Sequence, residues 1–169
     1  MIYAASFLMD ALGLAYALTI SAYARGELGA RPSQLGYLGG VVTGVYGIGC
    51  LASGSLSDRW GSRPLVIASL CFGAWGGLPA TLLVTWLSPE AIWPLYLTGA
   101  GHGLALAFFW PPLMRQLSLL SPGNLLWRSL GAFNICWAAG MAAGSFGGPA
   151  LYDYGGPSLS LAACTIAAS

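Results

Sequence analysis

Long apolar tracts are the feature of this sequence that most limits what the chain can fold into. They cover residues 2–24, 35–55, 65–87, 91–113 and 129–151. A helix rises about 1.5 Å per residue, so about 20 residues cross a hydrocarbon core about 30 Å thick. Because lipid offers the backbone no hydrogen-bond partners, such tracts must satisfy their peptide groups internally, as helices. The sequence therefore predicts an all-α polytopic membrane protein.

Composition indicates the same class of protein. Charged residues make up 7% of the 169 residues, against about 25% in a soluble domain. So few charges cannot cover the surface of a soluble chain, and lipid must therefore surround most of it. The formal net charge of +1 gives no electrostatic reason to expect a nucleic-acid partner. The first tract lacks a basic N-terminal region and is too long for a signal peptide, which predicts a retained span.

The last apolar tract, residues 157–169, is shorter than the others. As a helix it covers roughly 20 Å, which is less than the hydrocarbon core. Either it is not a full span or the chain stops inside one, and we favour the second alternative, a partial sixth span. Breaks between spans are expected at prolines and at a glycine pair: Pro64, Pro89, Pro149, Pro157 and Gly155-Gly156.

Glycines recur at four-residue intervals in two of the tracts. The two ridges consist of Gly36, Gly40 and Gly44, and of Gly140, Gly144 and Gly148. Small residues at this spacing let two helix backbones approach closely within a membrane. Both ridges are therefore predicted to be helix-packing faces.

The arginines predict the orientation of the spans. Four of them flank the second-to-third and fourth-to-fifth connections: Arg59, Arg63, Arg115 and Arg128. The connections on the opposite side carry only Arg25 and Arg31. Because cytoplasmic loops carry an excess of basic residues, we expect residues 54–63 and the N-terminus to lie in the cytoplasm.

Residues 54–63, GSLSDRWGSR, are expected to form a sharp turn between two spans. Gly54 and Gly61 permit backbone conformations that residues with a Cβ resist, and Pro64 suits the first turn of the next helix. Asp58 is an acid in a position where bases are favoured. Such an acid needs a partner, for example a nearby arginine or the positive end of a helix.

This segment resembles the signature loop between helices two and three of the major facilitator superfamily. The residues that match are Gly54, Leu56, Asp58, Arg59, Gly61 and Arg63, and Ser62 departs from the pattern. The spacing of the spans is similar to that of the family from residue 2 onward. The resemblance implies the N-terminal six-helix half of a transporter of this family, with its sixth helix incomplete.

The resemblance also implies a function for the charges of this loop. In the family they form a cytoplasmic cluster that braces the two halves of the transporter, and the cluster is made and broken during alternating access. By resemblance, a gating charge cluster is expected from Gly54, Asp58, Arg59, Gly61, Arg63 and Arg115. Arg115 is included as a partner for the loop from across the cytoplasmic side.

A second resemblance lies in the fifth tract. Residues 140–149 look like a loose version of the glycine-proline motif that proton-driven antiporters of the family carry in helix five, without its usual order. Residues 97–103, LTGAGHG, lack the arginine that such antiporters often carry in helix four. The resemblance therefore identifies the superfamily and leaves the substrate open.

Ionisable groups inside a span are costly, so they are candidates for a substrate or proton site. Asp10 lies about two turns into the first tract, and could bind a cation or carry a proton there; alternatively, the span begins later and Asp10 lies near the membrane interface. His102 lies midway through the fourth tract. It could titrate or hydrogen-bond to substrate, or it is a neutral histidine satisfied by a neighbouring helix.

The fifth tract adds two further candidates. Asn134 and Trp137 are three residues apart and share a helix face, where they could bind a polar or aromatic ligand. The alternative is an interhelical hydrogen bond for Asn134 and packing for Trp137. Residues 110–112, Trp-Pro-Pro, are expected to end or kink the fourth helix.

Enzymatic functions have little support in this sequence. It contains one histidine, no lysine for a Walker motif and no set of residues with metal-ligand spacing, so we expect neither an enzyme nor a cofactor. The cysteines are isolated in apolar tracts and are interpreted as small hydrophobic residues: Cys50, Cys71, Cys136 and Cys164.

These features predict secondary transport of a small solute by alternating access, coupled to protons, in the bacterial inner membrane. The expected partners are the solute, membrane lipid, and either a missing C-terminal half of the same protein or a second copy in a homodimer. The alternative from another class is a half-size or truncated membrane protein that does not transport and acts as a scaffold or regulatory subunit.

Overall fold

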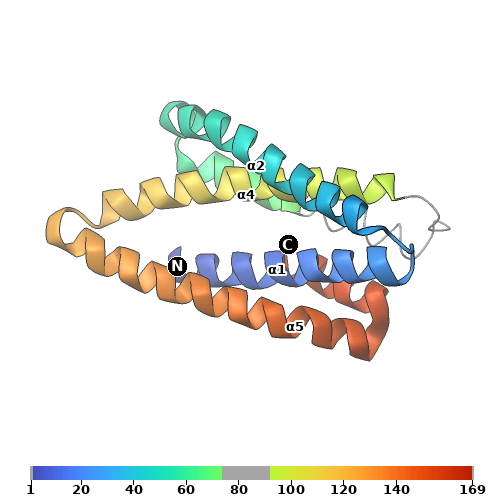
Figure 1. The fold of residues 1–169 in the computed structure, drawn as a ribbon. Helices are drawn as coiled ribbons and strands as arrows, with labels where there is room; N and C mark the ends of the chain where they lie inside the picture. The colour runs from blue at the N-terminus through green and yellow to red at the C-terminus, as the bar shows by residue number, and fades with distance from the viewer. Residues whose placement is uncertain (1, 74–91, 169) are drawn as a thin grey trace.

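The computed structural model describes residues 2–73 and 92–168, and helices account for nearly all of this part of the chain (Figure 1). The long helices are α1 (Ile2–Gly26), α2 (Pro32–Trp60), α4 (Trp93–Leu120) and α5 (Leu126–Ala168). A shorter helix, Ser62–Gly73, follows α2, and a single 3-10 turn, η1 (Gly123–Leu125), joins α4 to α5. The described residues contain no strand, so the all-α prediction is confirmed.

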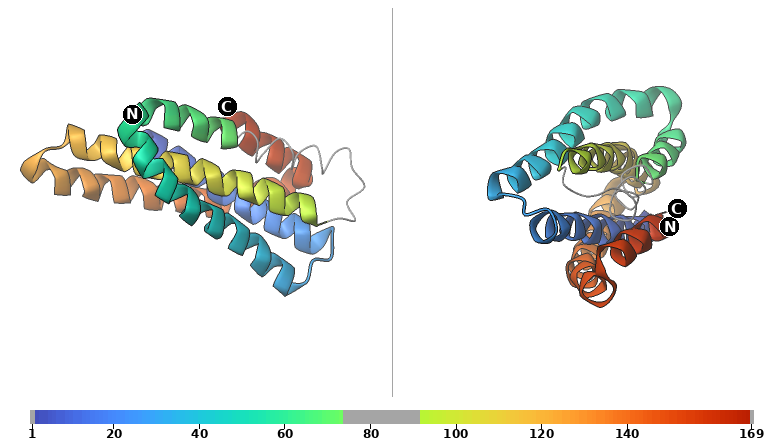
Figure 2. Two further views of the ribbon diagram at one scale, coloured as in Figure 1. Left: turned by 90° about the horizontal axis from the view of Figure 1, so that it is seen from above. Right: turned by 90° about the vertical axis from the view of Figure 1, so that its right-hand side faces the viewer.

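The long helices form two pairs. α1 packs along α5 and α2 packs along α4, whereas α1 has only a few contacts with α4 and with α2 (Figures 1 and 2). α4 and α5 meet mainly at the end where η1 joins them, as Figure 1 shows. The fold is therefore two tightly packed pairs with a narrower contact between them.

Small residues bring α1 and α5 together. Three glycines of α5 each face one residue of α1: Gly140 faces Phe7, Gly144 faces Ala11 and Gly148 faces Ala15. A Cβ at Gly140 or Gly144 would collide with a backbone carbonyl oxygen of α1, and one at Gly148 would lie 2.7 Å from a Cα atom. Real Cβ atoms do not approach so closely, so this ridge is a helix-packing face, as its spacing predicted.

The α2–α4 pair uses glycines in the same way, at positions that the sequence analysis did not select. A Cβ at Gly103 would lie 2.5 Å from the carbonyl oxygen of Val42, and one at Gly49 would lie 2.6 Å from the Cβ of Ala107. Gly99, one turn before Gly103, would bring a Cβ to within 3.2 Å of Val42. The four-residue spacing of Gly99 and Gly103 was visible in the sequence.

The first glycine ridge has different surroundings. A Cβ at Gly36, Gly40 or Gly44 would meet no described atom within 4 Å. This ridge therefore lies on a face of α2 that no other described element covers, and its packing function stays a prediction.

Three prolines that were expected at helix ends or breaks lie inside long helices. Pro111 and Pro112 lie inside α4, which continues to Leu120, so the prediction that the helix ends or kinks at residues 110–112 is wrong about an end. Pro149 likewise lies inside α5. A proline removes one backbone hydrogen bond, and in these long helices the neighbouring turns continue without it.

The break in α5 comes from glycine. Gly156 has φ 70° and ψ −177°, a conformation that separates two helical segments and that residues with a Cβ rarely adopt. Pro157 begins the second segment, so the breaks predicted at Gly155-Gly156 and Pro157 are confirmed. Residues 74–87 of the predicted third span, together with Pro89, lie outside the described residues.

Membrane character is visible in the side chains that the described helices expose. Large apolar residues face outward on several of them, for example Ile48, Leu51, Ile135 and Phe146. By length and composition, α1 and α2 are the described helices that are apolar enough to cross a membrane. The apolar interior has two clusters, one around Tyr16 and Ile20 and one around Phe109 and Leu113.

Candidate functional site

An ion pair joins the end of α2 to α4. Nε of Arg115 lies 3.3 Å from Oδ1 of Asp58. Asp58 is in the last turn of α2, and Arg115 is in the penultimate turn of α4. The side chains are 74% and 41% exposed respectively, so the pair is accessible to solvent or to a partner.

The position of Asp58 explains why it needs this partner. The C-terminal end of a helix carries partial negative charge, which disfavours an acid in the last turn. Arg115 supplies the compensating positive charge from a different helix. The sequence analysis named Arg115 as a partner for the loop, and the structure brings the two side chains together.

The turn after Asp58 is shorter than expected. Gly61 alone separates α2 from the helix Ser62–Gly73, with φ 81° and ψ 170°, and its N–H donates to the carbonyl oxygen of Ser57 at 3.0 Å. Gly54 lies within α2 and has no positive φ, so the expectation that it supplies unusual backbone geometry is wrong. A helix that continues to Trp60 needs no such freedom at residue 54.

Arg59 and Arg63 lie on either side of this turn and are exposed. Neither has an ion pair with a described residue. Their expected part in the gating charge cluster stays a prediction, because no described partner holds them.

Asp10 and Trp137, proposed separately from the sequence, meet at the α1–α5 interface. The indole of Trp137 lies next to the Asp10 carboxyl group. The other carboxyl oxygen, Oδ2, is buried and has no partner among the described residues. Asp10 is therefore half-buried, with one carboxyl oxygen enclosed between the helices.

His102 lies where the two helix pairs meet. Its ring is 5.2 Å from the ring of Tyr16, centroid to centroid, and a Cβ at Gly13 would be 3.2 Å from its Cε1 atom. Gly13 and Tyr16 belong to α1, whereas His102 belongs to α4. The absence of a side chain at Gly13 gives the imidazole room to pack against α1, which fits the interpretation of His102 as a packed interhelical residue.

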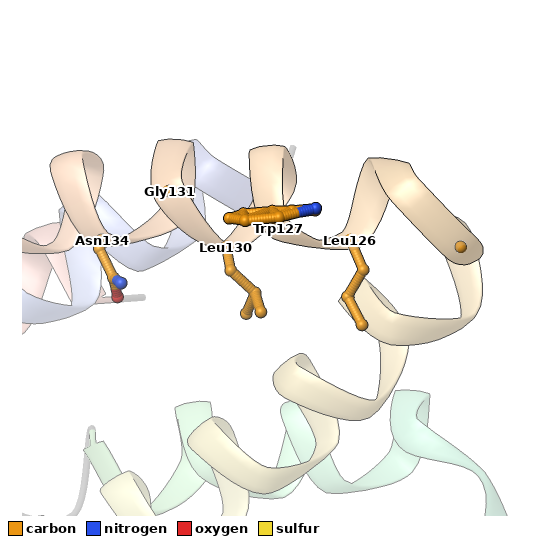
Figure 3. Close-up of a pocket in the computed structure, with 6 residues that line it drawn as sticks. Leu126, Trp127, Leu130, Gly131 and Asn134 are labelled. Atoms are coloured by element: carbon orange, nitrogen blue, oxygen red, sulfur yellow. The ribbon is translucent and has the colours of Figure 1, made fainter.

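Asn134 lies apart from this group, in a groove at the start of α5. The groove has a volume of about 510 Å³ and is mostly apolar; its lining residues are Gly123, Leu126, Trp127, Leu130, Gly131 and Asn134 (Figure 3). Figure 3 shows the side chains of Leu126, Leu130 and Asn134 on one side of the helix. The sequence analysis identified Asn134 and missed the apolar groove that it borders.

A buried hydroxyl pair was also missed. Oγ1 of Thr19 lies 2.7 Å from Oγ of Ser160, which ties α1 to the segment of α5 after Gly156. Both side chains are buried. Nothing in the sequence pattern indicated that these two residues, on opposite ends of the chain, are neighbours.

Metal ligands do not gather in this part of the molecule. Within residues 2–73 and 92–168, no group of three or more His, Cys, Asp or Glu side chains is placed to hold a metal ion. The candidate groups are therefore the exposed Asp58–Arg115 pair at one end and the buried residues around Asp10 and His102.

Comparison with known proteins gives one finding. The family model described as Major Facilitator Superfamily matches residues 2–168, which is nearly the entire chain. No curated protein and no solved structure matches the chain significantly.

Proposed function

The chain belongs to the Major Facilitator Superfamily, whose members are integral-membrane transporters, and we propose that it forms the N-terminal half of a secondary transporter. The half has six helices, of which the last is the partial segment after Gly156. Together with a second half it moves a small solute by alternating access, with the solute between the two halves. The observation that carries this proposal is the ion pair between Asp58, in the family's signature segment, and Arg115 of α4.

The Asp58–Arg115 ion pair is weak enough to form and break during a transport cycle. Exposed ion pairs contribute about 0.2–1 kcal/mol, because water competes for both charges. A contact of this size holds the ends of α2 and α4 together in one state and breaks at little cost in another. Arg59 and Arg63, which have no described ion-pair partner, are available to the second half in the same cluster.

The second half requires a surface to pack against. The glycine ridge of α2, at Gly36, Gly40 and Gly44, has no described neighbour and could accept a helix at close range. We propose that a C-terminal half of the same protein covers this ridge. A second copy of this chain is the alternative occupant.

The buried candidates suit a coupled transporter. Asp10 is the proposed proton-binding group, because one of its oxygens is buried without a described partner. His102 lies between the helix pairs, and Asn134 borders the apolar groove, so we propose that they contribute to the path of the solute. The proposed location is the bacterial inner membrane, with the N-terminus and residues 54–63 in the cytoplasm.

The experiment measures proton flux in everted membrane vesicles that contain the full-length gene product. A pH-sensitive dye reports the collapse of an imposed proton gradient when solutes from a chemically diverse panel are added one at a time. The proposal expects at least one solute to collapse the gradient in the wild type and much more slowly in Asp58→Ala. Asp153→Asn, which removes an exposed acid far from Arg115 in sequence, is the matched control.

Two results would contradict this function. Wild-type flux in Asp58→Ala would exclude the gating assignment. A gene product no larger than this chain, found as a monomer in native membranes and inactive towards the entire panel, would favour the non-transporting scaffold or regulatory subunit. An immunoblot with an antibody against residues 54–63 distinguishes that product from one of about twice the size, which two similar halves would give.

A further inference from the structure

Three buried oxygen atoms on α1 have no hydrogen-bond partner among the described residues: Oγ of Ser6, Oδ2 of Asp10 and the hydroxyl oxygen of Tyr23. Ser6 is completely buried, with 0% of its surface exposed. Buried polar side chains are almost always hydrogen-bonded in native proteins, so each orphaned oxygen needs an explanation. Because Ser6 and Asp10 are one helical turn apart, a single explanation for both of their oxygens is sought.

Helix geometry places the side chains of Ser6 and Asp10 next to each other. Residues four apart lie on the same face of a helix, with their Cβ atoms about 5–6 Å from each other. This face of α1 lies next to the one formed by Phe7 and Ala11, which packs against the α5 glycines. Ser6 and Asp10 are therefore neighbours at the edge of the close α1–α5 contact.

Among the described residues, no positively charged side chain is paired with Asp10. α5 contributes Trp137, whose indole lies next to the carboxyl group. α4 contributes His102, which lies one turn further along α1, against Gly13 and Tyr16. No described arginine forms an ion pair with Asp10.

As a carboxylate, the half-buried Asp10 would keep its enclosed oxygen, Oδ2, negatively charged without a counterion among the described residues. Burial of such a charge is strongly unfavourable, and the group avoids the cost by becoming neutral. A neutral carboxylic acid has an O–H donor, for which the Ser6 hydroxyl is the acceptor one turn away. One proton thus accounts for the orphaned oxygens of Ser6 and Asp10.

We propose that Ser6, Asp10 and Trp137 form a proton-binding site at the α1–α5 interface. Asp10 carries the proton on Oδ2 and donates it in a hydrogen bond to Oγ of Ser6, after a small side-chain rotation. The indole N–H of Trp137 donates to the other carboxyl oxygen. On release, the O–H bond breaks and the proton passes to a water molecule entering beside Trp137, which is 40% exposed. This leaves a carboxylate held by the indole.

The use of this site in transport rests on the proposed function, but its occupancy by a proton does not. Ser6 and Trp137 are positioning residues in this scheme, because they act through the Asp10 carboxyl group. Infrared spectroscopy separates these two claims, since it detects the carboxylic acid directly and needs no solute.

The experiment records the C=O stretch of protonated carboxyl groups in the full chain, reconstituted in lipid vesicles at pH 7. Ordinary aspartate and glutamate side chains titrate near pH 4 and are ionised under these conditions. The sequence has only five acidic residues, so few variants are needed to assign a band. We expect a carboxylic-acid band in the wild type and in Asp153→Asn, and its loss in Asp10→Asn.

Ser6→Ala and Trp137→Phe test the positioning residues. Ser6→Ala should shift the band to higher wavenumber, since the acid loses its hydrogen-bond acceptor, whereas the exposed control Ser145→Ala should leave it in place. Trp137→Phe should also shift the band, and the exposed control Trp93→Phe should not. A band that stays in place in Ser6→Ala would exclude Ser6 from the site.

Absence of a carboxylic-acid band from the wild type at pH 7 would overturn the proposal, as would its persistence in Asp10→Asn. If Asp10→Asn does not insert into membranes, carbon-13 labelling of the aspartate carboxyl groups replaces it. The wild-type band must then shift, and an unshifted band would overturn the proposal. A band assigned to Asp10, together with unchanged proton flux in Asp10→Asn, would establish the proton site and contradict only its use in coupling.

Discussion

The imidazole of His102 lies against the backbone of Gly13, so closely that a methyl group on Gly13 would be 3.2 Å from the Cε1 atom. The contact joins α4 to α1, two helices that otherwise have few contacts. Together with the two apolar clusters, it is one of the contacts through which a change in one helix pair affects the other.

Gly13→Val should destabilise the chain through this contact. Added methyl groups in a packed interior typically cost about 1–3 kcal/mol, and His102 has to move to accommodate them. The control is Gly39→Val in α2, where a Cβ meets no described atom within 4 Å. Denaturant unfolding in mixed micelles measures the difference, and His102→Ala should recover part of the loss in Gly13→Val but not in Gly39→Val. Equal effects of the two valines would contradict the contact.

Gly144→Ala and Gly147→Ala should have opposite effects although the residues are neighbours in α5. A Cβ at Gly144 would collide with the carbonyl oxygen of Ala11, whereas one at Gly147 would meet no described atom within 4 Å. We expect a loss of about 1–3 kcal/mol for the first, since the helices must separate. The second should be neutral or gain up to about 1 kcal/mol, because alanine favours a helix over glycine. The free energy of unfolding in micelles checks both, and a tolerated alanine at residue 144 would mean that α1 and α5 are further apart.

The Asp58–Arg115 pair should affect stability little. Single variants Asp58→Asn and Arg115→Gln are expected to lose no more than about 1 kcal/mol, because both side chains are exposed. A double-mutant cycle should give a coupling energy of about 0.2–1 kcal/mol that falls as salt is added. A coupling energy that is zero at low salt would indicate that the two side chains do not interact in solution.

Thr19→Val should destabilise the chain more than its change in shape implies. It leaves the Ser160 hydroxyl buried without its partner, which costs about 1–3 kcal/mol. Replacement of both groups, in Thr19→Val with Ser160→Ala, should cost less than the sum of the single variants. Unfolding in micelles measures all three, with the exposed Ser145→Ala as the control, and strict additivity would argue against the hydrogen bond.

The sequence was sufficient to predict helices but not their surroundings. Two glycine ridges with the same four-residue spacing have opposite environments: Gly144 lies against a carbonyl oxygen of α1, and Gly40 has no described neighbour. Spacing determines that one face of a helix is narrow. Which helix covers that face depends on how the helices are arranged, and local sequence carries no information about this.

Helix ends and side-chain pairs show the same limit. Pro111 and Pro112 suggested a terminus, but a long helix tolerates the loss of single backbone hydrogen bonds when its neighbours continue. Asp10 and Trp137 were each identified as candidates, yet their proximity depends on the relative rotation of α1 and α5. Electrostatics predicted only that Asp58 needs a positive charge nearby; Arg115 was named as that partner through the resemblance to the family.

The left-handed backbone at Gly156 determines whether α5 fits a bilayer at all. Its 43 residues would form a straight rod about 65 Å long, roughly twice the thickness of the hydrocarbon core. The bend at one residue instead returns the last segment beside α1, where Ser160 meets Thr19 (Figure 1). A side chain at this position would disfavour the bend. With glycine there, α5 folds back into a hairpin whose length suits a bilayer; without the bend, the straight helix would be too long for one.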